Sequence, residues 1–209
     1  EAVLSASNPD ADDNFGRAVG LSRDGSTIAV SALKEDGADT GVSNGGTGDM
    51  ANGSSDAGAV YVYRLTGGGW TQQAYIKATN TSSSAKFGGS LALSRDGNRL
   101  VVSAYAESSS AKGIGGDQSN NSMSFAGAAY QYQFDTTTSA WDTANIAYIK
   151  SAYTFGSDRF GRGLALSDDG NTLAVSSDGD DSSATGVATG DNRSLADSLA
   201  SGSGAVYLY

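Results

Sequence analysis

The sequence predicts an all-β protein made of three copies of one unit, each a sheet of four antiparallel strands. The main observation is a phrase that begins with Phe-Gly and ends with Asp-Gly and occurs three times. Its copies begin at Phe15, Phe87 and Phe160. A nearly constant period of this kind indicates repeated copies of one supersecondary unit. The high glycine content, 29 of 209 residues, and the lack of sustained helical periodicity favour short strands joined by turns.

The first two strands of each unit are predicted to form a hairpin. In the second copy, residues 91–94 and 100–103 are apolar runs on either side of Arg95-Asp96-Gly97. Aspartate suits such a turn, and glycine takes its left-handed conformation without steric cost. The equivalent turns are Arg23-Asp24-Gly25 and Asp168-Asp169-Gly170. We therefore interpret Asp24, Asp96 and Asp169 as turn residues.

The third and fourth strands follow a long polar segment in each copy. The third begins with Gly-Ala and is rich in tyrosine and β-branched residues, which favours a strand. The fourth follows a tryptophan, Trp70 or Trp141, and includes residues 74–78 or 147–151. Leu4, Ile76 and Ile149 each stand eleven residues before a Phe-Gly phenylalanine. Residues 2–7 are therefore expected to form a further fourth strand. The third strands are expected at residues 58–63, 127–132 and 204–209.

Sheets of this kind, packed face to face around an axis, form a β-propeller. The whole chain, residues 1–209, is then one propeller domain with blades of about 73 residues, at roughly 1–73, 74–146 and 147–209. Residues 2–7 would belong to the blade before the first. A β-solenoid is the competing architecture, but its repeats are usually shorter. Because rings have about four to eight blades, we expect either part of a longer propeller, which we favour, or two copies that form one six-bladed ring.

The repeated phrase resembles the FG-GAP repeat: Phe-Gly, a hairpin with Asp-Gly, and then Gly-Ala-Val-Tyr. That repeat builds the seven-bladed propeller of integrin α subunits and of many bacterial extracellular proteins. The resemblance covers nearly the whole chain and implies an extracellular or cell-surface protein of adhesion or recognition. Integrin-type repeats often carry a calcium loop between the first two strands. The short turns here cannot supply six to eight oxygen ligands, so the family's calcium sites are not transferred.

Composition and charge exclude several classes of function. The chain contains no cysteine and no histidine, which excludes disulfides, thiolate nucleophiles and a histidine general base. Its formal net charge of −10 disfavours nucleic acids and anionic membranes as partners. No apolar run approaches the ~20 residues of a membrane-spanning helix. A non-catalytic protein is expected.

The long connections are the expected location of function. Those after the second strand span 33–57, 105–126 and 177–203, and those before Phe-Gly span 8–14, 79–86 and 152–159. All should lie on one face, and they vary between copies, as a recognition surface does; tolerated insertions are the alternative. Four aromatic residues in or beside them do not repeat and are the expected ligand contacts: Tyr105, Phe125, Tyr153 and Phe155. The two tryptophans and the repeated tyrosines are expected to pack within the scaffold.

Two acidic clusters lie in the same connections. One comprises Asp178, Asp180 and Asp181, and the other Asp10, Asp12 and Asp13. Alternating carboxylates on a turn can converge on Ca²⁺, which is the cofactor these clusters would take. Neither cluster matches a complete calcium loop, and solvated acidic turns are the alternative.

Three functions follow, in order of preference. The first is a non-catalytic extracellular module that binds a protein or a glycan through the long connections. The second is a structural module that associates with further blades or with itself in a surface layer, a fibre or a large adhesin. The third is a propeller enzyme that acts on polysaccharide.

Overall fold

The structure, a computed structural model, describes residues 1–46, 48, 51–187 and 198–209. Within these residues all regular elements are β-strands, and every strand pairing is antiparallel. No helix long and apolar enough to cross a membrane occurs in this described part. The predicted all-β class is confirmed.

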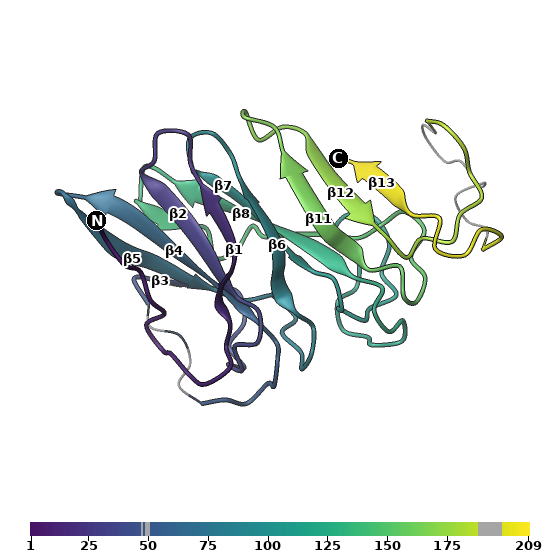
Figure 1. The fold of residues 1–209 in the computed structure, drawn as a ribbon, viewed down its shortest axis with the longest axis horizontal. Coiled ribbons are helices and arrows are strands. Elements are labelled where there is room, and N and C mark those ends of the chain that lie inside the picture. The colour runs from purple at the N-terminus through teal and green to yellow at the C-terminus, as the bar shows by residue number, and fades with distance from the viewer. Residues whose placement is uncertain (47, 49–50, 188–197) are drawn as a thin grey trace.

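The strands form three sheets, which do not have the uniform four strands expected (Figure 1). The first sheet has the order β1 (Phe15–Leu21), β2 (Thr27–Ala32), β4 (Ala59–Thr66), β5 (Gly69–Ile76) and β3 (Val42–Asn44). The second has the order β10 (Ala147–Ile149), β8 (Ala128–Asp135), β7 (Arg99–Ala104) and β6 (Phe87–Leu93), and β9 (Ala140–Trp141) also pairs with β8. The third has the order β11 (Phe160–Leu166), β12 (Leu173–Ser177) and β13 (Ala205–Leu208).

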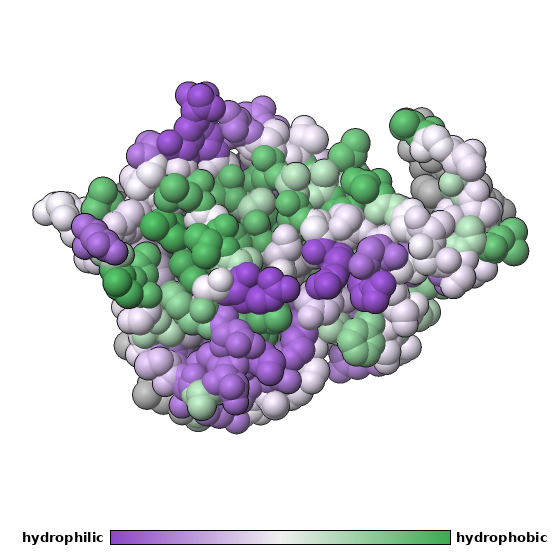
Figure 2. Space-filling model, in the orientation of Figure 1, coloured by the Kyte–Doolittle hydropathy of each residue, from purple (hydrophilic) through white to green (hydrophobic). Residues whose placement is uncertain are grey.

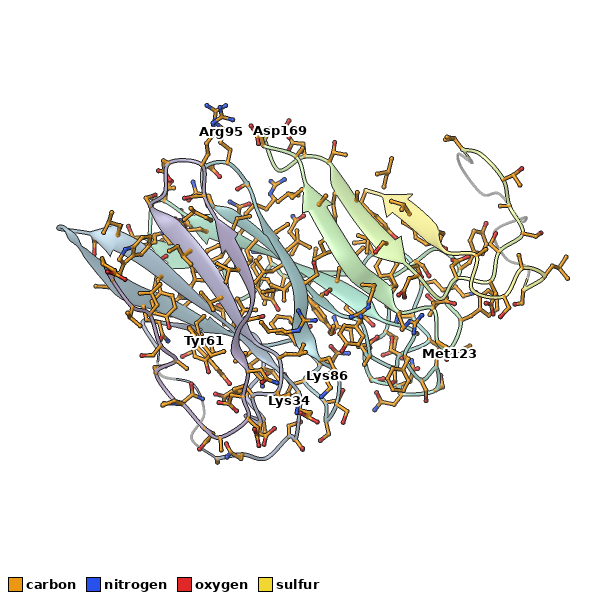
Figure 3. The ribbon with its side chains drawn as sticks, viewed as in Figure 1. Lys34, Tyr61, Lys86, Arg95, Met123 and Asp169 are labelled. Carbon is orange, nitrogen blue, oxygen red and sulfur yellow. The ribbon has the colours of Figure 1, made fainter. Side chains whose placement is uncertain are left out.

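In the described residues the three sheets form an open row that does not close into a ring. β1 contacts β6, and β6 contacts β11, so the first strands of the sheets lie next to one another. The two termini lie at opposite ends of this row (Figure 1). Figure 3 shows the hairpin turns at one end of the sheets, with Arg95 and Asp169, and the long connections at the other, with Lys34, Lys86 and Met123. We call these the turn end and the loop end.

Residues 2–7 are not a strand, contrary to expectation. The described residues contain no backbone ladder for this segment. Its position is nevertheless that of a fourth strand. The Tyr63 hydroxyl donates to the Ser5 carbonyl at 2.6 Å, as Tyr132 donates to Lys77 at 2.7 Å and Tyr209 to Lys150 at 2.6 Å. The segment therefore lies against the first sheet as the end of β5 lies against the second.

The long connections contain a repeated element that the sequence analysis missed. In the first, β3 pairs with β5 and places Val42 opposite Ile76. In the second, Ile114 forms an isolated antiparallel bridge with Ile149, at the equivalent position. Val42 and Ile114 each follow a glycine and stand one repeat period apart. The prediction that these connections differ from copy to copy is therefore wrong for this part of them.

The Phe-Gly pair marks a bulge that fits one sheet against its neighbour. The pairing of β11 with β12 shifts register between Phe160 and Leu164, and Gly161 there has a φ of 93°. A Cβ on Gly161 would lie 2.7 Å from the Ser103 Cβ of the second sheet, closer than side-chain carbons approach. The Phe160 ring packs edge-on against Tyr207 at 5.5 Å. The repeated phrase thus encodes packing within and between sheets.

A buried ion pair recurs in the two larger sheets. Lys77 Nζ lies 2.6 Å from Glu35 Oε2, and Lys150 Nζ lies 2.7 Å from Glu107 Oε2, with all four side chains at most 2% exposed. In the first, the Tyr75 hydroxyl and the Asn8 amide also donate to Glu35. Burial lowers the pKa of both lysines, while the facing glutamate opposes that shift. These pairs attach each long connection to the fourth strand of its own sheet.

Candidate functional site

Two equivalent junctions at the loop end have the same backbone. The first junction lies between the first and second sheets, and the second junction lies between the second and third. In the first, the amides of Ser84 and Phe87 donate to the carbonyls of Ser55 and Ala57, at 2.7 and 2.8 Å. In the second, the amides of Ser157 and Phe160 donate to those of Ser124 and Ala126, at 2.8 and 3.0 Å. The repeat therefore fixes the frame of both junctions.

Positive φ angles at the junctions belong to this common frame. Phe125, Ser157 and Arg159 have φ values of 57°, 68° and 53°. The equivalent residues of the first junction are Asp56, Ser84 and Lys86, with φ values of 56°, 63° and 61°. Because both junctions have these angles, the angles by themselves do not indicate a binding site.

The side chains of the second junction line a pocket of about 270 Å³. Tyr105 follows β7 and Phe125 ends the long connection of the second sheet. Ser157 and Arg159 lie just before β11, and Arg162 lies within it. Phe125 is half exposed, which is unusual for a large aromatic residue. The pocket therefore combines two aromatic rings and two guanidinium groups drawn from two sheets.

The guanidinium groups are held at the rim of the pocket. The Arg162 guanidinium lies 4.9 Å from the centre of the Tyr105 ring, a distance that permits a cation–π interaction. Arg159 Nε lies 2.8 Å from Asp178 Oδ1, and Arg162 Nε lies 3.7 Å from Asp178 Oδ2. Two cations therefore share one carboxylate, and the residues that line the pocket include two guanidinium groups and no carboxylate. Arginine side chains in this arrangement suit a ligand that carries a carboxylate.

The first junction has no such arrangement of side chains. Asp56 stands in place of Phe125 and pairs with Lys86 at 2.9 Å. One repeat period earlier in the sequence, Leu33 stands in place of Tyr105 and Gly89 in place of Arg162. These four differences between the junctions fall on the pocket, and a further one, Asp158 in place of Ala85, lies between Ser157 and Arg159 and does not line it. Tyr105 and Phe125 depart from the residues of the other copies, whereas Arg162 matches Arg17 of the first copy, so Gly89 is the exception at that position.

Two of the four predicted ligand contacts, Tyr105 and Phe125, lie together in this pocket. Tyr153 and Phe155 are half-buried on the connection before β11 and are not among the residues that line it. Arg159 and Arg162 were not among the ligand contacts predicted from the sequence. Arg159 stands in place of Lys86, whose partner Asp56 is replaced by Phe125. Arg162 gave no such signal, because the first copy has Arg17 at its position.

The acidic residues 178–181 are not gathered around one point. Asp178 pairs with Arg159 and Arg162. Asp180 Oδ2 accepts from the Tyr207 hydroxyl at 2.6 Å, and Asp181 Oδ1 accepts from the Gly202 amide at 2.7 Å. Among the described residues no group of three acidic side chains has the arrangement of a metal site. The calcium site stays a prediction that the geometry of these side chains does not support.

The other acidic cluster lies beside residues 2–7. Asp10, Asp12 and Asp13 line a hollow of about 360 Å³ together with Leu4 and neighbouring residues. Asp13 is buried and accepts from the Asp10 amide at 3.0 Å, and burial raises the pKa of its carboxyl. Asp10 accepts from the Asn52 amide at 3.0 Å. Asp13 therefore caps a turn of its own connection, whereas Asp10 binds the connection of residues 33–57, and a calcium site at this cluster stays a prediction.

The turn end carries a shallower cluster. Arg23, Arg95 and Asp168 occupy equivalent positions of the three hairpin turns and border a hollow of about 490 Å³. Both arginines approach Asp168, at 3.4 and 3.9 Å, and all three side chains are more than half exposed. Asp24, Asp96 and Asp169 each accept from the serine two residues earlier at 2.6 Å, which confirms their turn role. Exposed pairs of this kind contribute little binding energy, so the junction pocket is the stronger candidate.

Comparison with known protein families supports the resemblance of the repeated phrase to the FG-GAP repeat. Residues 70–132 match the model of the FG-GAP repeat family, a span that runs from β5 to β8. No curated protein matches the chain.

Proposed function

We propose that this chain, which carries an FG-GAP repeat, is a non-catalytic extracellular recognition module whose second-junction pocket binds a carboxylate-bearing partner. In this proposal the three sheets are blades of a β-propeller, and the loop end is the binding face. The observation that carries the proposal is the contrast between the two junctions. One backbone frame holds scaffold residues at the first junction and two aromatic and two arginine side chains at the second.

The chemistry of the pocket favours an acidic glycan over an acidic protein segment. The exposed Phe125 ring offers an apolar face to a sugar ring, and Arg159 and Arg162 offer paired donors to its carboxylate. Asp178 keeps the two guanidinium groups in place before the ligand arrives. The pocket residues include no pair of carboxylates such as glycoside hydrolysis needs, which supports binding without catalysis.

The experiment is a transplant of the first junction onto the second. The triple variant Tyr105→Leu, Phe125→Asp and Arg162→Gly gives the pocket the side chains found at Leu33, Asp56 and Gly89. Calorimetric titration would use an oligomer of a uronic acid as the probe, with a neutral oligosaccharide of the same length as the control. We expect the wild-type chain to bind only the acidic oligomer and the triple variant to lose at least tenfold in affinity.

A matched change at the first junction controls for general effects on the fold. Asp56→Asn and Lys86→Gln together remove the ion pair there, and binding should not change. An acidic peptide tested in parallel separates a protein partner from a glycan. The proposal would be contradicted if neither acidic probe bound, or if the triple variant bound the oligomer as well as the wild-type chain does.

A structural module is the second candidate, and a separate observation favours it. The outer faces of the first and third sheets expose large apolar side chains, which are Val19, Leu21, Val206 and Leu208. Faces of this kind are typical of assembly surfaces.

A further inference from the structure

The exposed faces at the two ends of the row of sheets carry the residues equivalent to those that pack together inside the molecule. We call the face of a sheet that carries Val60 and Val62, or their equivalents, its rear face, and the face that carries Leu91 and Leu93, or their equivalents, its front face. Inside the molecule, the rear face of each sheet packs on the front face of the next. At the first such contact, Val60 and Val62 of β4 share a core with Leu91 and Leu93 of β6. The equivalents of Val60 and Val62 in the third sheet are Val206 and Leu208, which are 67% and 71% exposed. The equivalents of Leu91 and Leu93 in the first sheet are Val19 and Leu21, which are 62% and 59% exposed.

Figure 2 shows the front half of this interface, where apolar surface gathers over the region of β1 and β2. Inside the molecule, each front face of this kind is covered by the rear face of the neighbouring sheet. A rear face with the pattern of β13 fits a front face with the pattern of β1, because the same fit occurs twice within the chain.

The backbones of β13 and of residues 2–7 are complementary as well. The third sheet ends at β13, which has no described strand on its outer edge, whereas β4 and β8 each pair with a fourth strand there. Residues 2–7 have the position of a fourth strand without a sheet to pair with. Figure 1 places the two at opposite ends of the row, so residues 2–7 cannot reach β13 of their own chain.

The buried polar residues agree with this match. The two complete sheets each pair a glutamate with a lysine, Glu35 with Lys77 and Glu107 with Lys150. The position of the lysine in residues 2–7 is Ser5, and the position of the glutamate in the third sheet is Asp180. In the sheet that residues 2–7 and β13 would form together, both the lysine and the glutamate of the buried ion pair are therefore replaced. Tyr207 and the Ser182 amide already satisfy Asp180, at 2.6 and 3.0 Å.

We propose that two copies of this chain associate reciprocally, with residues 2–7 of each copy added to β13 of the other as a fourth strand. The register follows from the complete sheets, in which Val62 pairs with Ala74 and Gln131 with Ala147. The equivalent pair across the two copies is Leu208 with Ala2. Val19 and Leu21 of one copy then cover Val206 and Leu208 of the other.

The first test is the mass of the chain in solution. Light scattering at micromolar concentration should give twice the chain mass of 21.0 kDa. The variants Val19→Asp and Leu208→Asp lie at exposed positions, so they should fold normally, as near-ultraviolet circular dichroism would show, yet run as monomers. A wild-type chain that stays monomeric at this concentration would overturn the proposal.

The second test fixes the register. The chain has no cysteine, so single cysteines report on one contact each. A tagged Ala2→Cys copy mixed with a Leu208→Cys copy should form a mixed disulfide under mild oxidation, because directly opposed residues are within bonding distance. The mixture of Ala2→Cys with Val206→Cys is two residues out of register and should react at least tenfold less. Equal yields from the two mixtures would overturn the proposed pairing, even if the chain is dimeric.

Discussion

The first and second junctions are built on one backbone frame but differ in the chemistry of their side chains. At the first junction, Asp56 and Lys86 form an ion pair between neighbouring connections. At the second, Phe125 and Arg159 occupy the same two places, and Arg159 turns to Asp178 instead. The comparison teaches that the repeat keeps hydrogen bonds, bulges and glycines, while the side chains that line the pocket differ between the two junctions. Function is then sought in the departures from the repeat, including those on or beside strands.

The largest expected effect concerns the frame that both junctions share. Glu107→Ala leaves the Lys150 ammonium buried without its partner, which should cost about 3–5 kcal/mol of unfolding free energy. Glu35→Ala should cost a similar amount, because Lys77 is equally buried. Urea denaturation measures both. A loss below about 1 kcal/mol in either variant would mean that the ion pair is not part of the common frame.

The double variant Glu107→Gln with Lys150→Met serves as the control for this prediction. It removes both charges and keeps the side-chain volume nearly unchanged. We expect it to recover most of the stability lost in Glu107→Ala, since replacing a whole buried pair is often close to neutral.

The second prediction separates backbone strain from contact between sheets. Gly16 and Gly161 have nearly the same φ, 92° and 93°, but only Gly161 faces a neighbouring sheet. Gly16→Ala should cost about 1–2 kcal/mol from the positive φ alone. Gly161→Ala should cost about twice as much, because its Cβ would also collide with Ser103. Equal losses of thermal stability in the two variants would contradict the role assigned to the Phe-Gly pair.

The third prediction uses a carboxyl that only the second junction has. Asp158 stands where the first junction has Ala85, and burial raises its pKa to about 6, with Asp180 and Asp181 adding to the shift. Its folded pKa exceeds its unfolded value of about 3.9, so the folded state binds the proton more tightly, and stability falls as pH rises from about 4 to 6. Asp158→Asn should therefore raise stability at pH 7.5 by about 1 kcal/mol, or ~2–4 °C in Tm.

The same change should have little effect at pH 4, where the carboxyl is protonated. The asparagine oxygen can still accept from the Phe155 amide, which donates to Asp158 at 2.7 Å. Differential scanning calorimetry at the two pH values checks this prediction. A gain that is equal at both values would show that the charge of Asp158 is not its cause.

The fourth prediction concerns a substitution that gives the second junction the aspartate of the first. Phe125→Asp places a carboxylate beside Arg159, as Asp56 lies beside Lys86. Phe125 is half exposed, so we expect stability to change by less than about 1 kcal/mol. Hydrogen exchange of the Ser157 and Arg159 amides, which donate to the Ser124 and Phe125 carbonyls, should stay the same. Faster exchange there would mean that the side chains, and not the repeat, fix the frame of the junction.

Much of the fold could be predicted from local signals in the sequence. The Phe-Gly and Asp-Gly phrases placed the hairpins β1–β2, β6–β7 and β11–β12, because turn chemistry depends on neighbouring residues. The fourth-strand prediction for residues 2–7 failed, since a strand also needs a partner. The Glu–Lys pairs were missed although both members recur with the period of the repeat, because charged residues at these positions suggested exposed connections and not a buried contact.

The candidate site could be predicted only in part, for a similar reason. Tyr105 and Phe125 stood out as aromatic residues that do not repeat. Their proximity to Arg159 and Arg162 depends on how the third sheet packs on the second, and no local sequence pattern predicts that packing. Comparison of the three copies distinguishes Tyr105 and Phe125 but not Arg162, because Arg17 stands at the same position of the first copy.

The smallest expected effect lies at the turn end, where the three copies can be made identical by one change. Asp168→Arg gives the third turn the arginine found at Arg23 and Arg95. It removes two exposed ion pairs, at 3.4 and 3.9 Å, and brings three cations together. Because these side chains are exposed, the loss should be about 0.5 kcal/mol at low salt and should vanish near 1 M NaCl, where the screening length is about 3 Å. Thermal unfolding at both salt concentrations measures it, with Asp168→Asn as the variant that removes the pairs without adding charge. A loss that persists in high salt would mean that the turns pack more tightly than their exposure indicates.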